Sequence, residues 1–270
     1  WQNEFTQNSY TEMMKFYQGN NIYEFEWIFI KTNEITDDFS DHFNNQLANE
    51  WEWLNDNNNY WSLNSNPNKL TINLQPGGIS NNAFSNPSNL LLIDVIEFDF
   101  EIQTKISFSP SSDFQFAGLL IYQDEDNALQ FGRSFCEPCG IGEGLYFDNI
   151  ISDNFSGSNF KRSLFNDQDI YLKVQNSKGE YTGFVSTDNQ SWYIIGKHNR
   201  QLSDIKVGII AAQAYNQTTD AQFDYFMYST NFILDNSTVP GITVNVISDN
   251  TTEAGGTASF TLVLDSEPTA

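Results

Sequence analysis

Apolar and polar residues alternate with a period of two along much of the chain. The longest such run is Ile96–Phe108, where apolar side chains stand at positions 96, 98, 100, 102, 106 and 108. This period predicts a strand with one buried and one solvated face. Similar alternation predicts strands at Ile170–Gln175, Tyr181–Ser186 and Ile205–Gln213. Two runs that are apolar on both faces, Phe114–Tyr122 and Gln222–Tyr228, predict central strands.

Asn, Asp, Ser and Gly cluster between these runs about every 8–12 residues, which is typical of an antiparallel sandwich or barrel. Asp188-Asn189 is predicted to form a hairpin turn. Helical periodicity is nearly absent, and only Ser40–Ala48 could hold one short helical turn. The predicted fold class is all-β, with two packed sheets.

The charge of the chain excludes several classes of partner. Its 270 residues contain 35 acidic and 12 basic side chains, a formal net charge of −23. Nucleic acid and anionic membrane surfaces would be repelled by such a surface. The longest apolar runs, Leu90–Ile93 and Gly208–Ala212, fall far short of the roughly 18 residues of a spanning helix. The chain begins at Trp1 without a signal-peptide pattern, so any such peptide is expected to lie outside it.

An internal similarity links the two ends of the chain. Phe25–Asn33 and Phe223–Asn231 share the pattern aromatic, acid, aromatic, three apolar residues, any residue, Thr, Asn. Chance similarity between two strands is one interpretation. In the other, residues 1–33 close a preceding copy of the domain, and the complete domain covers residues 34–235.

Residues 236–270 contain two further alternating strands, Ile242–Val246 and Thr257–Leu264, joined by Glu253–Gly256. Two strands do not form an independent domain, and unpaired strand edges favour aggregation. The terminal strands are therefore expected to pair with a neighbouring domain or subunit, which would give self-association. The alternative is that both ends add edge strands to the central sandwich.

Several ordered motifs resemble one known family. They are Asp37-Asp38-Phe39-Ser40, Trp51-Glu52-Trp53, Tyr60-Trp61-Ser62-Leu63, Leu70-Thr71-Ile72, Phe98–Lys105 and Ala117–Asn127. Across about residues 34–232 the chain is similar to the concanavalin A-like accessory domain at the C-terminus of bacterial and fungal β-xylosidases. The resemblance implies a jelly-roll β-sandwich. Catalysis does not carry over, because in that family the hydrolytic carboxylates belong to a separate propeller domain.

A second resemblance lies near the C-terminus. Thr252–Pro268 resembles the opening of a Calx-β repeat, which is common in large bacterial surface proteins. The run ends before most of that repeat.

One acidic triplet and the two histidines have side chains of catalytic types, and each is expected to have a non-catalytic role. Asp124-Glu125-Asp126 is expected to be a solvated turn between strands. His42 and His198 have no nucleophile motif around them and are expected at the surface. No catalytic residue is predicted, and the chain is expected not to be an enzyme.

Cys136 and Cys139 form the one C-x-x-C motif of the chain. A redox pair and half a zinc site are alternatives, but zinc needs four ligands and a redox pair normally begins a helix. A structural disulfide is the favoured interpretation and indicates an extracellular setting. Five glycosylation sequons are compatible with that setting: Asn154, Asn189, Asn216, Asn236 and Asn250.

Asp38 and Asp224 resemble the positions at which laminarinase-like jelly rolls bind calcium between the first and last strands. That resemblance implies a calcium site with carboxylate and carbonyl oxygens, which a net charge of −23 would favour. In the alternative, Asp38 caps a turn and Asp224 faces water.

Trp51, Trp53 and Trp61 could present flat rings to sugars, although large aromatic side chains more often pack in a core. Arg133 is expected on one strand with Gln130, where it could bind a ligand on an open sheet face or pair with an acid. These five residues are the candidate carbohydrate site.

The main functional hypothesis is a non-enzymatic, extracellular domain of a large repetitive surface or filament-forming protein with a structural or adhesive role. It depends on the missing catalytic motif, the incomplete ends and the acidic composition. The alternative is a carbohydrate-binding accessory module of a secreted glycoside hydrolase.

Overall fold

The computed structural model describes residues 9–18, 21–30, 38–79, 87–156, 159–163, 169–212, 217–232, 234, 242–244 and 262–264. Within these ranges the protein consists of strands and connecting loops, with two eight-stranded antiparallel sheets between residues 39 and 229. This confirms the predicted all-β sandwich. No helix in these ranges is long and apolar enough to cross a membrane.

The first sheet has its strands in the order β12-β11-β10-β9-β17-β7-β4, and β13 also pairs with β11. Its strands are β4 (Glu52–Leu54), β7 (Leu90–Asp94), β9 (Phe116–Asp124), β10 (Asn127–Cys136), β11 (Gly142–Ile151), β12 (Asn154–Phe155), β13 (Phe160–Ser163) and β17 (Lys206–Ala212).

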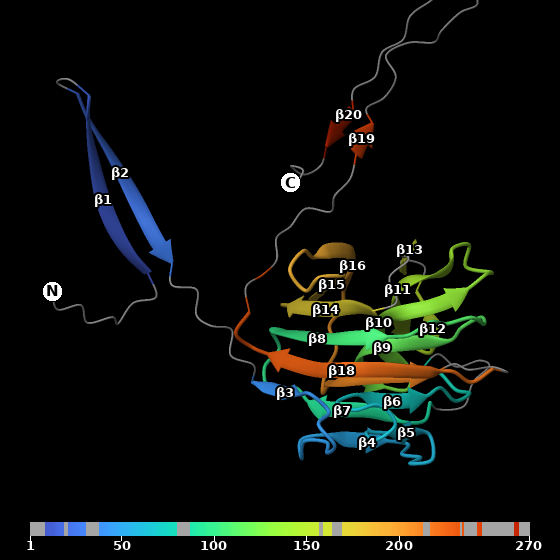
Figure 1. Cartoon of the computed structure of the whole chain (residues 1–270). Coiled ribbons are helices and arrows are strands. Elements are labelled where there is room, and N and C mark those ends of the chain that lie inside the picture. The colour runs from blue at the N-terminus through green and yellow to red at the C-terminus, as the bar shows by residue number, and fades with distance from the viewer. Residues whose placement is uncertain are drawn as a thin grey trace, which may run out of the picture.

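The second sheet has the order β16-β15-β14-β8-β18-β6-β5, and β3 also pairs with β18. Its strands are β3 (Phe39–Asp41), β5 (Trp61–Ser62), β6 (Leu70–Asn73), β8 (Phe100–Ser107), β14 (Asp169–Ser177), β15 (Glu180–Ser186), β16 (Tyr193–Asn199) and β18 (Asp220–Ser229). Figure 1 shows β18 running beside β8 in this sheet.

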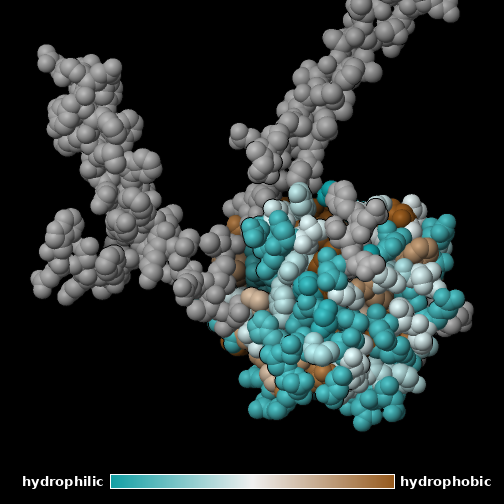
Figure 2. Space-filling model, viewed as in Figure 1, coloured by the Kyte–Doolittle hydropathy of each residue, from teal (hydrophilic) through white to brown (hydrophobic). Residues whose placement is uncertain are grey.

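The main core contains every second side chain of the strands in both sheets. Leu119 and Phe131 of the first sheet, and Leu172 and Phe226 of the second, belong to this single buried cluster. Because side chains in a strand alternate between its two faces, the intervening residues face away from the core. On the second sheet these outward residues are largely polar, and Figure 2 shows mostly hydrophilic residues on the face of the sandwich that it presents.

The central strands are predicted correctly from their two-sided apolar character. β9 lies between β10 and β17, and β18 lies between β8 and β6. The hairpin turn at Asp188-Asn189 is also confirmed, since it joins β15 to β16. Its geometry comes from Asp188, whose Oδ1 accepts the backbone N–H groups of Gln190 and Ser191 at 2.8 and 2.7 Å.

The predicted long strand Ile96–Phe108 is wrong at its beginning, since the observed strand starts at Phe100. Ile96 and Phe98 are 71% and 57% exposed. The Tyr228 hydroxyl accepts the backbone N–H of Ile96 at 3.1 Å, and Asn176 Nδ2 donates to the Phe98 carbonyl at 2.6 Å. These side chains take backbone groups that a strand would use in its ladder, so the segment is a loop.

Ser40–Ala48, the one segment with the capacity for a short helical turn by its sequence, contains the end of β3 followed by a loop. Asp41 favours this loop. Its carboxylate accepts the backbone N–H of Phe43 at 2.7 Å, the N–H of Ala48 at 2.9 Å and the indole N–H of Trp51 at 2.8 Å. A side chain that bonds nearby backbone groups in this way competes with helix formation.

In the described parts of the chain, the two N-terminal strands pair with each other, and so do the two C-terminal strands. β1 (Ser9–Gln18) pairs antiparallel with β2 (Asn21–Ile30), and β19 (Ile242–Val244) pairs antiparallel with β20 (Leu262–Leu264). The linker around Glu253–Gly256 lies outside the described residues. The proposed role of residues 1–33 and 236–270 in pairing with a neighbour stays a prediction.

Candidate functional site

A cavity of about 370 Å³ opens on the face of the first sheet that is turned away from the second sheet. Strand alternation explains its position. In β11, Leu145 and Phe147 pack into the main core, so Tyr146 and Asp148 lie on the opposite face. Both line the cavity, and its size is within the range of small-molecule sites, about 300–1,000 Å³.

The cavity combines aromatic walls with separate polar groups. Its aromatic lining residues are Phe114, Phe116, Tyr146 and Phe155. Its polar lining residues are Ser134, Asp148, Ser156, Asn159 and Lys161, and the disulfide cysteines complete it. Mostly apolar walls with a few placed hydrogen-bonding groups are the usual composition of a small-molecule site.

Asp148 is the buried carboxylate of this site, with only 8% of its surface exposed. It lies opposite Gln130 in the β10–β11 ladder, and Gln130 Nε2 donates to its Oδ2 at 3.0 Å. Burial raises the pKa of Asp148 to about 6, while the Gln130 bond and the charge of Lys161 act in the opposite direction. Gln130 Oε1 is buried and has no hydrogen-bond partner among the described residues.

Tyr146 supplies both a ring and a hydroxyl. Its hydroxyl donates to the Gly142 carbonyl at 2.7 Å, which holds the ring in place along the β11 strand. Burial raises the pKa of Tyr146 to about 12, and the nearby Asp148 and Asp113 act in the same direction. The hydroxyl is therefore neutral at physiological pH, and its oxygen can still accept a hydrogen bond from a ligand.

Cys136 and Cys139 are joined by a disulfide, with their Cα atoms 5.2 Å apart. The bond forms a wall of the cavity at the end of β10. Lys161 Nζ on β13 donates to the Cys139 carbonyl at 2.7 Å, so the disulfide turn is tied to the strand on the other side of β11. The covalent bond and this hydrogen bond together set the shape of one side of the site.

These groups suit the reversible binding of a ligand with hydroxyl groups. Asp148 is the one carboxylate among the described lining residues, whereas glycoside hydrolysis uses a pair. A carboxylate, a serine hydroxyl, an amide and an ammonium group provide acceptors and donors, and the aromatic rings provide apolar surface.

The predicted sugar-binding tryptophans lie elsewhere. Trp51 packs against Phe39 and Phe226 with ring centroids 5.2 and 5.0 Å apart. Trp53 and Trp61 stack on each other with centroids 4.8 Å apart. All three are partly buried against the main core, so the structure supports the packing alternative for them.

The other two predicted sugar contacts, Gln130 and Arg133, lie on opposite faces of β10. Gln130 lies beside the cavity through its bond to Asp148. Arg133 is buried on the opposite face of β10, and its guanidinium pairs with Glu143. Arg133 is thus an ion-pair partner, which was the alternative to a ligand contact.

The structure does not bring Asp38 and Asp224 together. Phe39 pairs with Tyr228, which places Asp38 near the end of β18, about five residues or roughly 16 Å from Asp224. The Asp38 carboxylate accepts the backbone N–H of Thr230. No group of three or more potential metal-ligating side chains occurs among the described residues. The structure therefore separates the two predicted ligands, and calcium binding stays a prediction.

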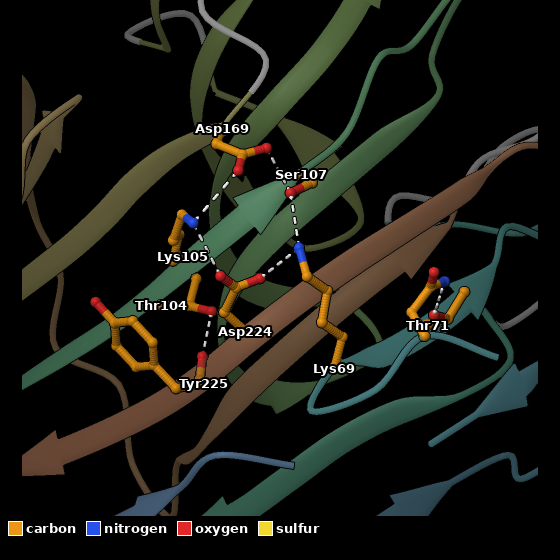
Figure 3. A network of polar contacts seen from close by, with 9 residues as sticks. Lys69, Thr71, Thr104, Lys105, Ser107, Asp169, Asp224 and Tyr225 are labelled. Atoms are coloured by element: carbon orange, nitrogen blue, oxygen red, sulfur yellow. Dashed lines mark hydrogen bonds and ion pairs between the residues drawn. The ribbon is translucent and has the colours of Figure 1, made fainter. Parts of the chain in front are cut away.

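Asp224 instead belongs to an ion network on the outer face of the second sheet (Figure 3). A β-bulge between Phe223 and Tyr225 redirects its side chain. The carboxylate lies 2.9 Å from both Lys69 Nζ and Lys105 Nζ. Asp224 is the largest cause of the raised pKa of Lys105. Two ammonium groups already neutralise this carboxylate, so it is a poor cation ligand.

Two predicted sequons lie in the described ranges. Asn154 is exposed on β12, and its Nδ2 donates to the Ser152 carbonyl at 2.7 Å. Asn189 is exposed in a hairpin turn, and its Oδ1 accepts Gln103 Nε2 at 2.7 Å. Asn216, Asn236 and Asn250 lie outside the described residues.

The expected surface position of His198 is wrong. Its side chain is buried, its Nε2 lies 3.0 Å from the Phe147 carbonyl, and burial lowers its pKa. His42 is exposed, as expected.

Sequence reasoning missed most of the cavity, namely Ser134, Tyr146, Asp148, Phe155 and Lys161. The sequence does contain one indication of the site. Asp148 is the single acidic residue of the segment Leu145–Ile151, in which every other residue except Asn149 is apolar or aromatic. A charged residue on a buried strand needs a partner or a functional reason.

Comparisons with known proteins identify the family of this sandwich. Residues 36–229 match the β-xylosidase C-terminal concanavalin A-like domain family. A search of curated protein sequences gave no match.

Three similar solved structures show the same fold. The GH43 BlXynB protein from Bacillus licheniformis is 17% identical, with a TM-score of 0.64 over 80% of this chain and 46% of its own. The xylan β-1,4-xylosidase from Bacillus halodurans C-125 is 20% identical, with a TM-score of 0.60 over 70% and 38%. The Bacteroides ovatus xyloglucan GH43B protein is 18% identical, with a TM-score of 0.59 over 70% and 38%.

The chain spans less than half the length of each of these three proteins. The family model covers residues 36–229, and the two sheets of the sandwich occupy the same part of the chain. The chain therefore belongs to the β-xylosidase C-terminal concanavalin A-like domain family.

Proposed function

We propose that this protein is a carbohydrate-binding accessory domain of a secreted glycoside hydrolase and that it is not itself catalytic. The cavity on the first sheet carries this proposal. It places the buried Asp148 and Ser134 among the aromatic side chains Tyr146, Phe114 and Phe155. Sugars present hydroxyl groups and apolar ring faces together, which matches this lining.

The hydroxyl of Ser134 supports this proposal further. Ser134 is buried and lines the cavity, and no described residue hydrogen-bonds to its side chain. This hydroxyl can therefore both donate a hydrogen bond to a ligand hydroxyl and accept one from it.

Membership of this family favours the accessory-domain proposal and does not favour a surface or filament role. One related structure is named as a xylan β-1,4-xylosidase, so xylan is the first polysaccharide to test. The disulfide at the cavity fits secretion into an oxidising compartment. No comparison supports the filament hypothesis, which rested on the missing catalytic motif, the incomplete ends and the acidic composition.

Binding is tested with two phenylalanine variants of similar exposure. Phe155 lines the cavity and is 49% exposed, whereas Phe98 is 57% exposed in the β7–β8 loop and is absent from the lining. We expect the protein to be retarded in gels containing xylan, F155A to lose most of this retardation and F98A to keep it. Equal retardation of all three proteins, or retardation of none by xylan, xyloglucan or cellulose, would contradict the proposal.

A further inference from the structure

We propose that the cavity receives the uncharged terminal sugar unit of a chain, and not an internal stretch of it. This inference rests on the proposed carbohydrate-binding function and adds a ligand class to it. It depends on two features of the site, a closed side and the charge of its floor.

The closed side comes from the bridge between the disulfide turn and β13. Lys161 Nζ donates to the Cys139 carbonyl at 2.7 Å, and Cys139 is covalently bound to Cys136 at the end of β10. Tyr146 lies opposite Lys161 in the β11–β13 ladder and lines the same cavity. The bridge spans β11 on one side of the cavity, so it favours a chain end over a polysaccharide that runs past this side.

The floor favours hydroxyl groups over carboxylates. Asp148 is buried there, and no described residue donates to its Oδ1. An acceptor without a donor favours a ligand that donates hydrogen bonds, and a sugar hydroxyl does so.

Charge acts in the same direction. A uronic acid would place a carboxylate near Asp148 in a chain whose net charge is −23. Lys161 is the one cation among the described lining residues, and it already donates to the Cys139 carbonyl. Like charges at close range in a buried site repel strongly, so a neutral sugar is favoured.

The test is calorimetric titration of the full 270-residue chain with xylose, xylobiose, xylotriose and xylohexaose, and with D-glucuronic acid at pH 7.5. We expect the affinity to reach its limit at xylobiose, with xylohexaose no more than about two-fold tighter. D-glucuronic acid should bind at least about ten-fold more weakly than xylose, since each ten-fold corresponds to about 1.4 kcal/mol.

Two lysine variants test the closed side. K161M removes the bridge and should make affinity increase with chain length. K197M alters an exposed lysine paired with Glu180 on the second sheet and should bind like the parent. Circular dichroism and the melting temperature establish that both variants are folded.

The outcomes separate this inference from the proposed function. Affinity that rises about ten-fold or more from xylobiose to xylohexaose in the parent protein would overturn the terminal-unit inference, as would equal binding of D-glucuronic acid and xylose. In both cases carbohydrate binding itself would stand. Absence of binding to every sugar, including cello-oligosaccharides, would overturn the proposed function and this inference together.

Discussion

The indole rings of Trp53 and Trp61 stack on each other with centroids 4.8 Å apart and planes inclined by 29°. Trp53 belongs to β4 at one edge of the first sheet, and Trp61 belongs to β5 at one edge of the second. The pair therefore joins the two sheets along one side of the sandwich. Trp61 Nε1 also donates to Asp56 Oδ1 at 2.9 Å, which orients its ring.

Removing either ring should destabilise the fold. We expect W53A and W61A each to lower the free energy of unfolding by about 2–4 kcal/mol, because a large aromatic contact at the core is lost. The double variant should lose about 1 kcal/mol less than the sum of the two, since the rings contact each other. Urea denaturation measures all three values, and strictly additive losses would contradict the stacked arrangement.

Asp148 should make stability depend on pH. Its pKa in the folded protein is about 6, above the value of about 3.9 in an unfolded chain. The folded state therefore favours the neutral carboxyl. Its contribution to the free energy of unfolding is fully present below about pH 4 and is lost as the pH rises through about 6.

The variant D148N cannot ionise at this position, so its free energy of unfolding should not fall between pH 4 and pH 6 through ionisation of this side chain. We expect the stability of D148N relative to the parent to rise by about 2–3 kcal/mol between pH 4 and pH 7, because two pKa units correspond to about 2.7 kcal/mol. Denaturation curves at pH 4, 5, 6 and 7 measure the difference. A constant difference across this range would show that the burial of Asp148 does not control its ionisation.

The Lys69–Asp224–Lys105 network should contribute modestly to stability. All three side chains are partly exposed, so we expect D224N to lower the free energy of unfolding by about 1 kcal/mol. The decrease should be smaller in 1 M NaCl, because salt screens such ion pairs. E180Q provides the comparison, since the more exposed Glu180–Lys197 pair should contribute almost nothing. Thermal or urea unfolding at two salt concentrations tests this, and a salt-independent loss would contradict it.

The terminal strands should control association without being needed for the sandwich. β1 and β2 bond to each other, as do β19 and β20, and none of them belongs to either eight-stranded sheet. We expect residues 34–235 to unfold cooperatively as a monomer, and the full chain to form larger species as its concentration rises. Urea denaturation tests the cooperative unfolding, and sedimentation velocity measures the association of both proteins. A full chain that stays monomeric at every concentration would remove the self-association hypothesis.

Some features of the fold follow from local sequence, because their physical cause is local. Apolar runs predicted β9 and β18 as central strands. The reason is clearest for β9, whose side chains are buried on both faces of the first sheet. The hairpin turn at Asp188-Asn189 was likewise predictable, because Asp188 bonds residues only two and three positions away. The resemblance in the ordered motifs predicted the family before the strand order was known.

Other features depend on residues that are distant in sequence. Alternation alone predicted a strand from Ile96, but Tyr228 accepts the backbone N–H of Ile96 across 132 positions, and the strand begins at Phe100. The two predicted calcium ligands lie apart for a similar reason. Asp224 meets Lys69 and Lys105 only after β6, β8 and β18 have aligned, and that alignment leaves Asp38 far along the strand.

The sequence by itself determined the all-β class, the central strands and the family, because side-chain periodicity and turn residues act within a few positions. Tertiary structure alone decided the cavity. Asp148 and Gln130 are opposite each other through the β10–β11 register, and Lys161 reaches Cys139 only because β13 pairs with β11. Register and sheet order set which outward side chains converge, and no local pattern in the chain encodes that convergence.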